Sequence, residues 1–188
     1  MKSEPIPEYG ELTGPGELRL VRLLPGPVER VWSYLTEPAK RAKWLAGGPM
    51  ELRTGGSLTL QWDHAKITPH REDVPEKYRE MCASGATTTG KVTRCDPPAV
   101  LAYTWDEGGG IFSEVTFELS AKGDHTILVT THRKLGSREM LLSVAAGWHT
   151  HFGILEDVMT GRTPRPFWSN HSRLEEEYAR RLPLAAIS

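Results

Sequence analysis

Alternating hydrophobic and polar residues occupy the middle of the chain. Three segments show this pattern, and their apolar members are Leu58, Leu60 and Trp62, then Leu101, Tyr103 and Trp105, then Val115, Phe117 and Leu119. A period of two is typical of antiparallel strands with one face on a core and the other in water. Glycines at 108–110 and the AKGD segment at 121–124 predict hairpin turns between such strands. The sequence therefore predicts a half-buried antiparallel sheet.

The segment before this region predicts one more strand and two short helices. ELRLVRLLP, from Glu17 to Pro25, has the composition of a strand and ends in a Pro-Gly-Pro turn signal. A helix is expected to begin at Pro27 and to stop before Pro38, because its apolar residues follow the i, i+3, i+4, i+7 spacing. A second short helix is expected from about Pro38 to Leu45.

The longest helical pattern lies near the C-terminus, in GWHTHFGILEDVMTG from Gly147 to Gly161. At about 100° per residue, a buried stripe forms from Leu141, Ala145, Trp148, Phe152, Leu155 and Met159. His149 and Glu156 lie on one edge of this stripe, and His151 lies on the other. Edge residues of this kind either have solvent and backbone partners or line a cavity, and the sequence leaves both alternatives open. Trp148, at the centre of the stripe, is most simply a core residue.

Two polar segments flank these elements. Residues 63–85 form an insert in which Asp73 and Glu76 predict a capping box for a short helix through Met81. The insert is either a solvated excursion at a sheet edge or a lid over a pocket. Residues 169–188 predict a charged helix, with a capping box at Ser172 and Glu175, that stops at Pro183. This helix packs back on the domain or docks on a second subunit, so a homodimer is possible.

Composition limits the classes of function. A chain of 188 residues with 38% hydrophobic content fits one domain with one core. The 23 Lys and Arg residues nearly balance the 24 Asp and Glu residues, so the net charge of −1 supports no nucleic-acid surface. The uncharged run between Glu139 and Glu156 is shorter than the ~20 residues of a membrane span, so no membrane insertion is expected. The absence of an export signal and the presence of only Cys82 and Cys95 favour the cytoplasm.

Metal and cofactor sites are not expected. His149 and His151 lie on opposite edges of one helix, and chelation of a single metal by two histidines of a helix needs i, i+4 spacing. The glycine clusters precede no helix, so they are not phosphate-binding loops. The sequence therefore predicts no cofactor and no bound metal.

A series of motifs resembles a known superfamily. In order they are PGPVERVWSYLTEPAKRAKWL from Pro25 to Leu45, GGSLTL, GKVTRCDPPAVLAYTW, SEVTFEL, THRKL and GWHTHFGILEDVMTGRTPRPFW. Together, from about Tyr9 to Pro183, they are similar to the START-related SRPBCC superfamily, in the branch named for the activator of the heat-shock-protein-90 ATPase. The resemblance implies an α+β helix-grip fold, in which a curved antiparallel sheet wraps around a long C-terminal helix and two short helices lie near the N-terminus. It also implies a lead at 1–16, a single START-like domain at 17–168 and a C-terminal helix and tail at 169–188.

Members of this superfamily bind lipids, polyketides or hormones between the sheet and the long helix. The resemblance and the pattern together suggest ligand-binding candidates, with His132 included through the resemblance alone. These candidates are Trp62, Tyr103, Trp105, His132, Trp148, His149, Phe152 and Glu156.

Three classes of function follow, in decreasing order of support. The first is binding of a small apolar or amphipathic ligand, lipid-like or polyketide-like, in the cavity. The second is a cyclase or hydrolase in which His132, His149 or Glu156 acts as general acid or base, although no GxSxG, HExxH or GxGxxG motif occurs to identify catalytic residues. The third is a co-chaperone, but the eukaryotic activators carry a further N-terminal domain with an Asn-rich tryptophan motif that does not occur here.

Overall fold

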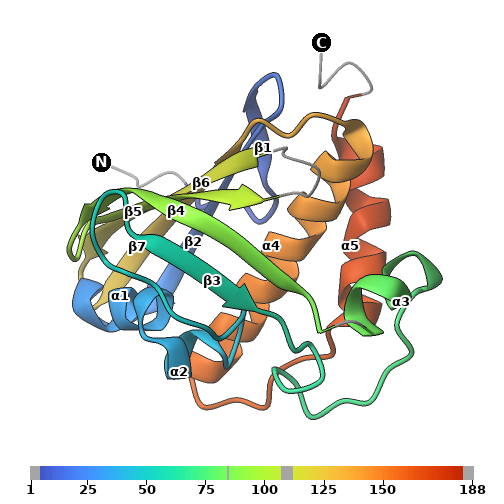
Figure 1. Cartoon of the computed structure of the whole chain (residues 1–188), viewed down its shortest axis with the longest axis horizontal. Helices are drawn as coiled ribbons and strands as arrows, with labels where there is room; N and C mark the ends of the chain where they lie inside the picture. Colours follow the sequence, from blue (N-terminus) through green and yellow to red (C-terminus); the bar gives the residue numbers. More distant parts are fainter. Residues whose placement is uncertain (1–4, 84, 107–111, 184–188) are drawn as a thin grey trace.

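The computed structural model describes residues 5–83, 85–106 and 112–183. These residues form one seven-stranded antiparallel sheet with the strand order β1-β2-β7-β6-β5-β4-β3. The strands are β1 (Glu11–Gly14), β2 (Glu17–Pro25), β3 (Ser57–Gln61), β4 (Thr87–Asp96), β5 (Val100–Asp106), β6 (Phe112–Lys122) and β7 (His125–Arg133). The helices are α1 (Val28–Thr36), α2 (Pro38–Arg41), α3 (Glu76–Ala83), α4 (Arg138–Met159) and α5 (Trp168–Arg181). The sheet curves around α4, and α5 lies beside α4 (Figure 1). The predicted helix-grip fold of the α+β class is therefore confirmed.

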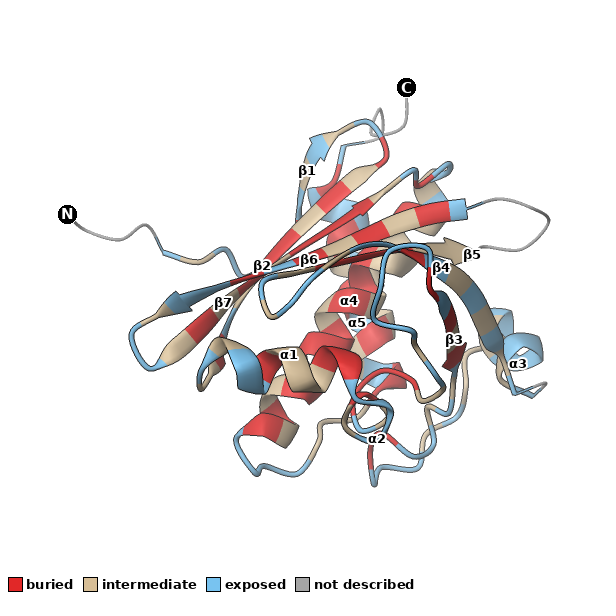
Figure 2. Cartoon of the chain, turned by 60° about the vertical axis from the view of Figure 1, so that its left-hand side comes forward, coloured by how far each residue is buried: buried red, intermediate tan, exposed pale blue. Residues whose placement is uncertain are grey.

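The alternating segments form strands as predicted. They fall on β3, β5 and β6, and buried residues alternate with more exposed ones along β3 and along most of β6 (Figure 2). On β5 the expected alternation is not seen, because Ala102 is buried together with Leu101 and Tyr103. Tyr103 is paired with Val92 on one side and Val115 on the other, and all three are buried. The turn predicted at 121–124 is present, with Gly123 in the left-handed region at φ 62°. The turn predicted at 108–110 lies outside the described residues.

The long helix α4 presents the predicted stripe to the sheet. Every member of that stripe is buried. The helix begins after Ser137, whose hydroxyl accepts a hydrogen bond of 3.1 Å from the backbone N–H of Met140. This cap satisfies one of the backbone donors that a helix N-terminus leaves without a partner. None of the described helices is long and apolar enough to cross a membrane.

The second short helix is shorter than predicted. It ends at Arg41, and the prediction that it reaches Leu45 is wrong. The reason is the buried Arg41 guanidinium, which donates hydrogen bonds to the carbonyl oxygens of Thr36, Ala46, Gly47 and Gly48. These bonds satisfy the carbonyl at the end of α1 and three carbonyls of the irregular segment that follows α2.

Both predicted capping boxes are wrong. α3 begins at Glu76 itself, so Glu76 is not the third residue of that helix. α5 begins at Trp168, and Ser172 therefore lies inside it. The N-terminus of α5 is instead bonded to the insert, because the Glu72 carboxylate accepts the backbone N–H groups of Trp168 at 2.9 Å and Ser169 at 3.0 Å.

The two ends of the chain add to the domain. Strand β1 forms within the 1–16 segment that was expected to be a lead, and it pairs with β2. α5 packs against α4 with Trp168, His171, Leu174 and Tyr178 buried. The packing of this helix on its own domain is thus present, while a homodimer stays a prediction.

Candidate functional site

A cavity of about 350 Å³ lies between the sheet, α4, the start of α5 and the insert. Aromatic side chains from all these parts line it, namely Trp62, Tyr78, Trp105, Trp148, Phe167 and Trp168. Four imidazoles also line it, those of His64, His132, His151 and His171, and so does the acidic residue Asp106. We call this space the inner cavity.

Three of its tryptophans are connected through Trp105. The Trp105 ring centroid lies 5.3 Å from that of Trp62 and 5.7 Å from that of Trp148. These rings come from the end of β5, the residue after β3 and the middle of α4. Because aromatic pairs at such distances attract one another beyond simple burial, the three rings form one continuous wall.

The hydrogen bonds of His132 fix its tautomer. The indole N–H of Trp148 donates to Nδ1 of His132 at 3.0 Å, so Nδ1 carries no proton. Burial lowers the pKa of His132 to about 3, so the ring is neutral at pH 7 and its proton is on Nε2. Nε2 lies 2.7 Å from the Ser113 hydroxyl oxygen, to which it therefore donates. In this arrangement His132 cannot accept the proton of Ser113.

His151 has the opposite tautomer. Its Nδ1–H donates to the backbone carbonyl of Trp44 at 2.6 Å, because a carbonyl oxygen only accepts. Burial, with a smaller contribution from His64, lowers the pKa of His151 to about 3. Nε2 is therefore a lone-pair acceptor, and among the described residues it has no hydrogen-bond partner. The cavity wall thus carries a hydrogen-bond acceptor for a ligand.

The remaining two histidines are also neutral. Burial, and then His171, lowers the pKa of His64 to about 4. Burial lowers the pKa of His171 as well, and its buried Nδ1 has no hydrogen-bond partner in the described part of the chain. Across residues 5–83, 85–106 and 112–183, no three His, Cys, Asp or Glu side chains are arranged to hold a metal ion. The imidazoles of the inner cavity therefore form an uncharged set of polar groups.

The structure brings together half of the candidate residues predicted from the sequence. Trp62, Trp105, His132 and Trp148 line the inner cavity. Tyr103 and Phe152 lie in the core, where Tyr103 stacks on Trp105 and Phe152 on Trp148, with centroids 6.4 Å and 5.3 Å apart. These two residues support the wall from behind.

His149 and Glu156 lie away from the cavity. The Tyr178 hydroxyl accepts the backbone N–H of Gly10 at 2.8 Å and lies 3.1 Å from Nδ1 of His149. The ring of Tyr9 packs edge-on against His149 as well. Glu156, in the last turn of α4, accepts a hydrogen bond of 3.1 Å from Arg162, which follows the helix. The edge of α4 that carries both residues therefore faces other parts of the protein and not the inner cavity.

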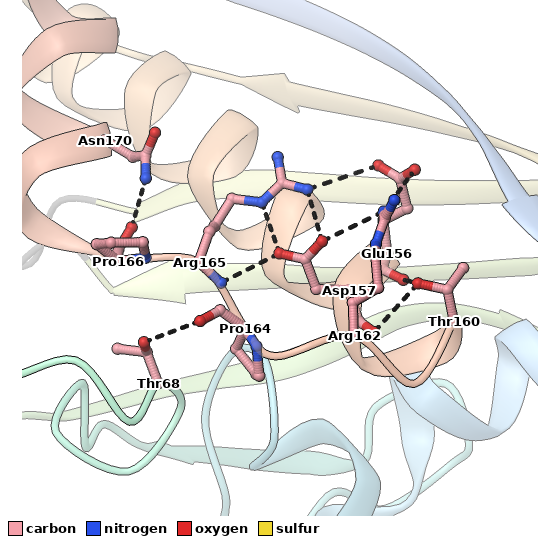
Figure 3. A network of polar contacts seen from close by, with 9 residues as sticks. All are labelled: Thr68, Glu156, Asp157, Thr160, Arg162, Pro164, Arg165, Pro166 and Asn170. Carbon is pink, nitrogen blue, oxygen red and sulfur yellow. Dashed lines mark hydrogen bonds and ion pairs between the residues drawn. The ribbon is translucent and has the colours of Figure 1, made fainter.

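An ion-pair network holds the segment that carries Phe167 and Trp168. The buried Asp157 carboxylate accepts hydrogen bonds from the backbone N–H of Arg165 at 3.1 Å and from its guanidinium at 2.7 and 2.8 Å (Figure 3). Burial alone would raise the pKa of Asp157, but the bonds from Arg165 outweigh it and lower that pKa. Thr68 of the insert adds a bond of 3.3 Å to the Pro164 carbonyl. These contacts position the connection between α4 and α5 against the cavity.

Sequence reasoning missed several lining residues. The sequence placed His151 on the edge of the helix stripe opposite to His149. That edge position was the available signal that His151 could line a cavity. Tyr78 and His64 belong to the insert, and Phe167, Trp168 and His171 belong to the α4–α5 connection and the start of α5. Their local sequence has no periodicity that points to a cavity.

Comparisons with known proteins agree with the fold. A protein encoded by gene BPP1335 of Bordetella parapertussis, with a solution NMR structure, is 39% identical over 95% of each chain, with a TM-score of 0.74. CalU16 of Micromonospora echinospora is 26% identical over 87% of this chain and 86% of that one, with a TM-score of 0.66. EF2215 of Enterococcus faecalis, at 18% identity, covers 92% of this chain and 90% of its own and shares the fold with a TM-score of 0.64. No curated protein matches the chain.

The sequence model of one family matches residues 25–160 and so covers the two short helices, the strands from β3 to β7 and α4. Since this match spans most of the chain, the protein belongs to the family described as Activator of Hsp90 ATPase homolog 1-like protein, within the SRPBCC superfamily.

Proposed function

We propose that this protein binds a small molecule with an apolar, ring-containing body in the inner cavity. The observation that carries the proposal is the cavity of about 350 Å³ walled by aromatic rings from the sheet, α4, α5 and the insert. Ligand sites are typically concave, mainly apolar and furnished with a few placed polar groups. The inner cavity has these properties.

The polar groups of the wall define what the ligand carries. Neutral imidazoles do not offset the cost of burying a charge, and Asp106, the acidic residue of this wall, already has an interaction partner. The proposed body inside the cavity is therefore uncharged. Nε2 of His151 accepts a hydrogen bond, and a hydroxyl or N–H group on the ligand would donate it. Each such bond contributes roughly 0.5–1.5 kcal/mol, as does each favourable aromatic contact.

The geometry gives less support to an enzyme. A general base works best with a pKa near the working pH, whereas the pKa values of His132 and His151 are about 3. The tautomer of His132 directs its proton toward Ser113, the reverse of what activation of a serine nucleophile requires. Binding is therefore the function that the geometry favours.

The family description also raises stimulation of a heat-shock-protein-90 ATPase. We expect the purified protein to leave the ATP turnover of such a chaperone unchanged. A coupled ATPase assay over a range of protein concentrations checks this, and a saturable several-fold stimulation would move the co-chaperone ahead of the binding protein.

Naphthalene and 1-naphthol test the binding function, because they differ only in one hydroxyl donor. Titrations followed by tryptophan fluorescence should show one saturable site that prefers 1-naphthol by about three- to ten-fold. His151→Phe should remove this preference, and His125→Phe, at a half-exposed histidine of β7 that lines neither cavity, is the matched control. Circular dichroism confirms that each variant is folded. If neither probe saturates, or if the wild type binds both equally, the proposed function is wrong.

A further inference from the structure

A second cavity of about 460 Å³ adjoins the inner one. The insert supplies most of its wall, and the rest comes from Trp62, Ala86, Phe167 and Trp168. We call it the outer cavity. Six residues line both spaces, namely Trp62, His64, Met81, Ala86, Phe167 and Trp168. The two cavities therefore meet along a shared, mainly aromatic boundary.

His64 lies at this boundary. Its ring centroid is 4.4 Å from that of Phe167 and 5.2 Å from that of Trp168, and it also stacks on Trp62 at 5.8 Å. Because burial lowers its pKa to about 4, the boundary is uncharged at neutral pH. An apolar part of a ligand can cross there without meeting a fixed charge.

Side chains of both charge signs line the outer cavity, whereas Asp106, an acidic residue, is the charged member of the inner lining. Two carboxylates line the outer cavity, and both are engaged by the protein. Asp63 forms an ion pair of 2.7 Å with Lys66. Glu72 accepts hydrogen bonds from the first backbone N–H groups of α5. Burial alone would raise the pKa of Glu72, but these bonds outweigh burial and lower it. The carboxylate therefore stays ionised.

Arg71 also lines the outer cavity, and unlike the two carboxylates it is not engaged by the described protein. In the part of the chain that the structure describes, its guanidinium takes part in no hydrogen bond or ion pair. Its side chain is exposed, so an anion beside it would keep part of its hydration. A guanidinium presents its donors in a planar fork that matches carboxylate, sulfonate and phosphate groups.

We infer that the ligand is an anionic amphiphile that spans both cavities. Its ring-containing body occupies the inner cavity, and its anionic group lies in the outer cavity beside Arg71. This inference rests on the proposed function, because it requires the inner cavity to hold the body. It assigns the negative charge to the outer cavity for a physical reason. The inner wall has neutral imidazoles and the acidic residue Asp106, neither of which favours an anion. The outer wall has the Arg71 guanidinium, which has no hydrogen bond or ion pair with the described residues.

Two fluorescent probes that differ by one anionic group test this inference. They are 8-anilinonaphthalene-1-sulfonate and N-phenyl-1-naphthylamine, which is the same molecule without the sulfonate. Arg71→Gln should weaken binding of the sulfonate about three-fold, as expected for a partly exposed ion pair, and leave the neutral probe unchanged. Raising the salt concentration should weaken sulfonate binding to the wild type but hardly affect Arg71→Gln.

The matched control is Arg94→Gln. Arg94 is an exposed arginine on β4 that pairs with Asp96 and lines neither cavity. It should affect neither probe. If both probes bind at one saturable site and Arg71→Gln changes the two affinities equally or not at all, the inference is wrong while the proposed function stands. If neither probe binds, both are wrong.

Discussion

The indole of Trp148 and the imidazole of His132 are joined by a hydrogen bond of 3.0 Å across the interface between α4 and β7. Both residues are buried, and both line the inner cavity. The bond explains how a tryptophan in the middle of an apolar stripe can belong to the core and to a cavity wall at once. One side of its ring packs on Phe152, while its polar edge has a defined partner on the sheet.

Removing this donor should destabilise the fold. Trp148→Phe keeps an aromatic ring but leaves Nδ1 of His132 buried without that donor, which costs about 1–3 kcal/mol. Urea unfolding measures the loss. Trp105→Phe is the control, because the Trp105 indole N–H has no hydrogen bond with the described residues. In the wild type, nitrogen NMR shifts of His132 should show Nε2 protonated and Nδ1 bare; the reverse would contradict the assignment.

His149→Ala should affect stability and not ligand binding. The change removes the contact with the Tyr178 hydroxyl and the edge-on packing against Tyr9, so we expect a loss of about 1–2 kcal/mol in unfolding free energy. Affinity for 1-naphthol should stay at the wild-type value, because His149 does not line the inner cavity. A clear loss of affinity in a folded variant would place His149 in the site after all.

Mild acid should destabilise the protein. Folding keeps His132, His149 and His151 neutral, with pKa values of about 3, whereas unfolded histidine has a pKa of about 6.5. Between these values the unfolded state binds more protons, so stability falls as the pH falls, by up to about 1.4 kcal/mol per pH unit for each group. Urea midpoints at pH 7.5, 6.5 and 5.5 measure this trend above the range where carboxylates titrate. A midpoint that stays constant or rises toward pH 5.5 would contradict it.

Asp157 should matter more than its neighbour Glu156. Asp157→Asn breaks a mostly buried ion pair with Arg165, and we expect a cost of about 1–3 kcal/mol after allowing for the partial exposure of Arg165. The variant should also weaken 1-naphthol binding, because the segment bearing Phe167 and Trp168 loses its anchor. Glu156→Gln, at a half-exposed ion pair, should cost less than about 1 kcal/mol. Equal effects of the two changes would refute this role of Asp157.

Helix α3 should behave as a lid held by a few polar contacts. It buries none of its residues, and an isolated helix this short is only marginally stable. The Tyr78 hydroxyl lies 2.9 Å from that of Ser143 and donates to Glu175 at 3.2 Å, and Lys77 also pairs with Glu175.

Glu175→Ala should therefore speed hydrogen exchange of the amides in Glu76–Ala83 and raise the rates of 1-naphthol association and dissociation. Glu176→Ala is the control, because Glu176 is an exposed residue of α5, the helix that also carries Glu175. Faster exchange without any change in ligand rates would favour the alternative, that the insert is only an excursion at the sheet edge.

Local periodicity was enough to predict most of the strands and the long helix, while their helix-grip arrangement came from the resemblance to the superfamily. The period-two segments around Leu60, Tyr103 and Phe117 became strands because one face of each is buried. The stripe through Trp148 and Phe152 became the buried face of α4 for the same reason. These patterns are properties of adjacent residues, so they can be read without knowing what packs against them. The end of α2 was misjudged because Arg41 bonds carbonyls beyond the helix, a contact that no local pattern reveals.

The candidate site depended on the tertiary structure. Trp62, Trp105 and Trp148 could be chosen as aromatic residues on apolar faces, but only folding shows that their rings meet. The two edges of α4 are alike in sequence, each with a histidine, and the difference between them is what covers each edge. Tyr9 and Tyr178 cover His149, whereas His151 faces a space walled by the insert and the start of α5. Glu72 bonds the start of α5 across 96 residues of sequence, and Asp157 anchors the connection between α4 and α5 through Arg165. The identity of the cavity wall is therefore decided by tertiary contacts that no local pattern reveals.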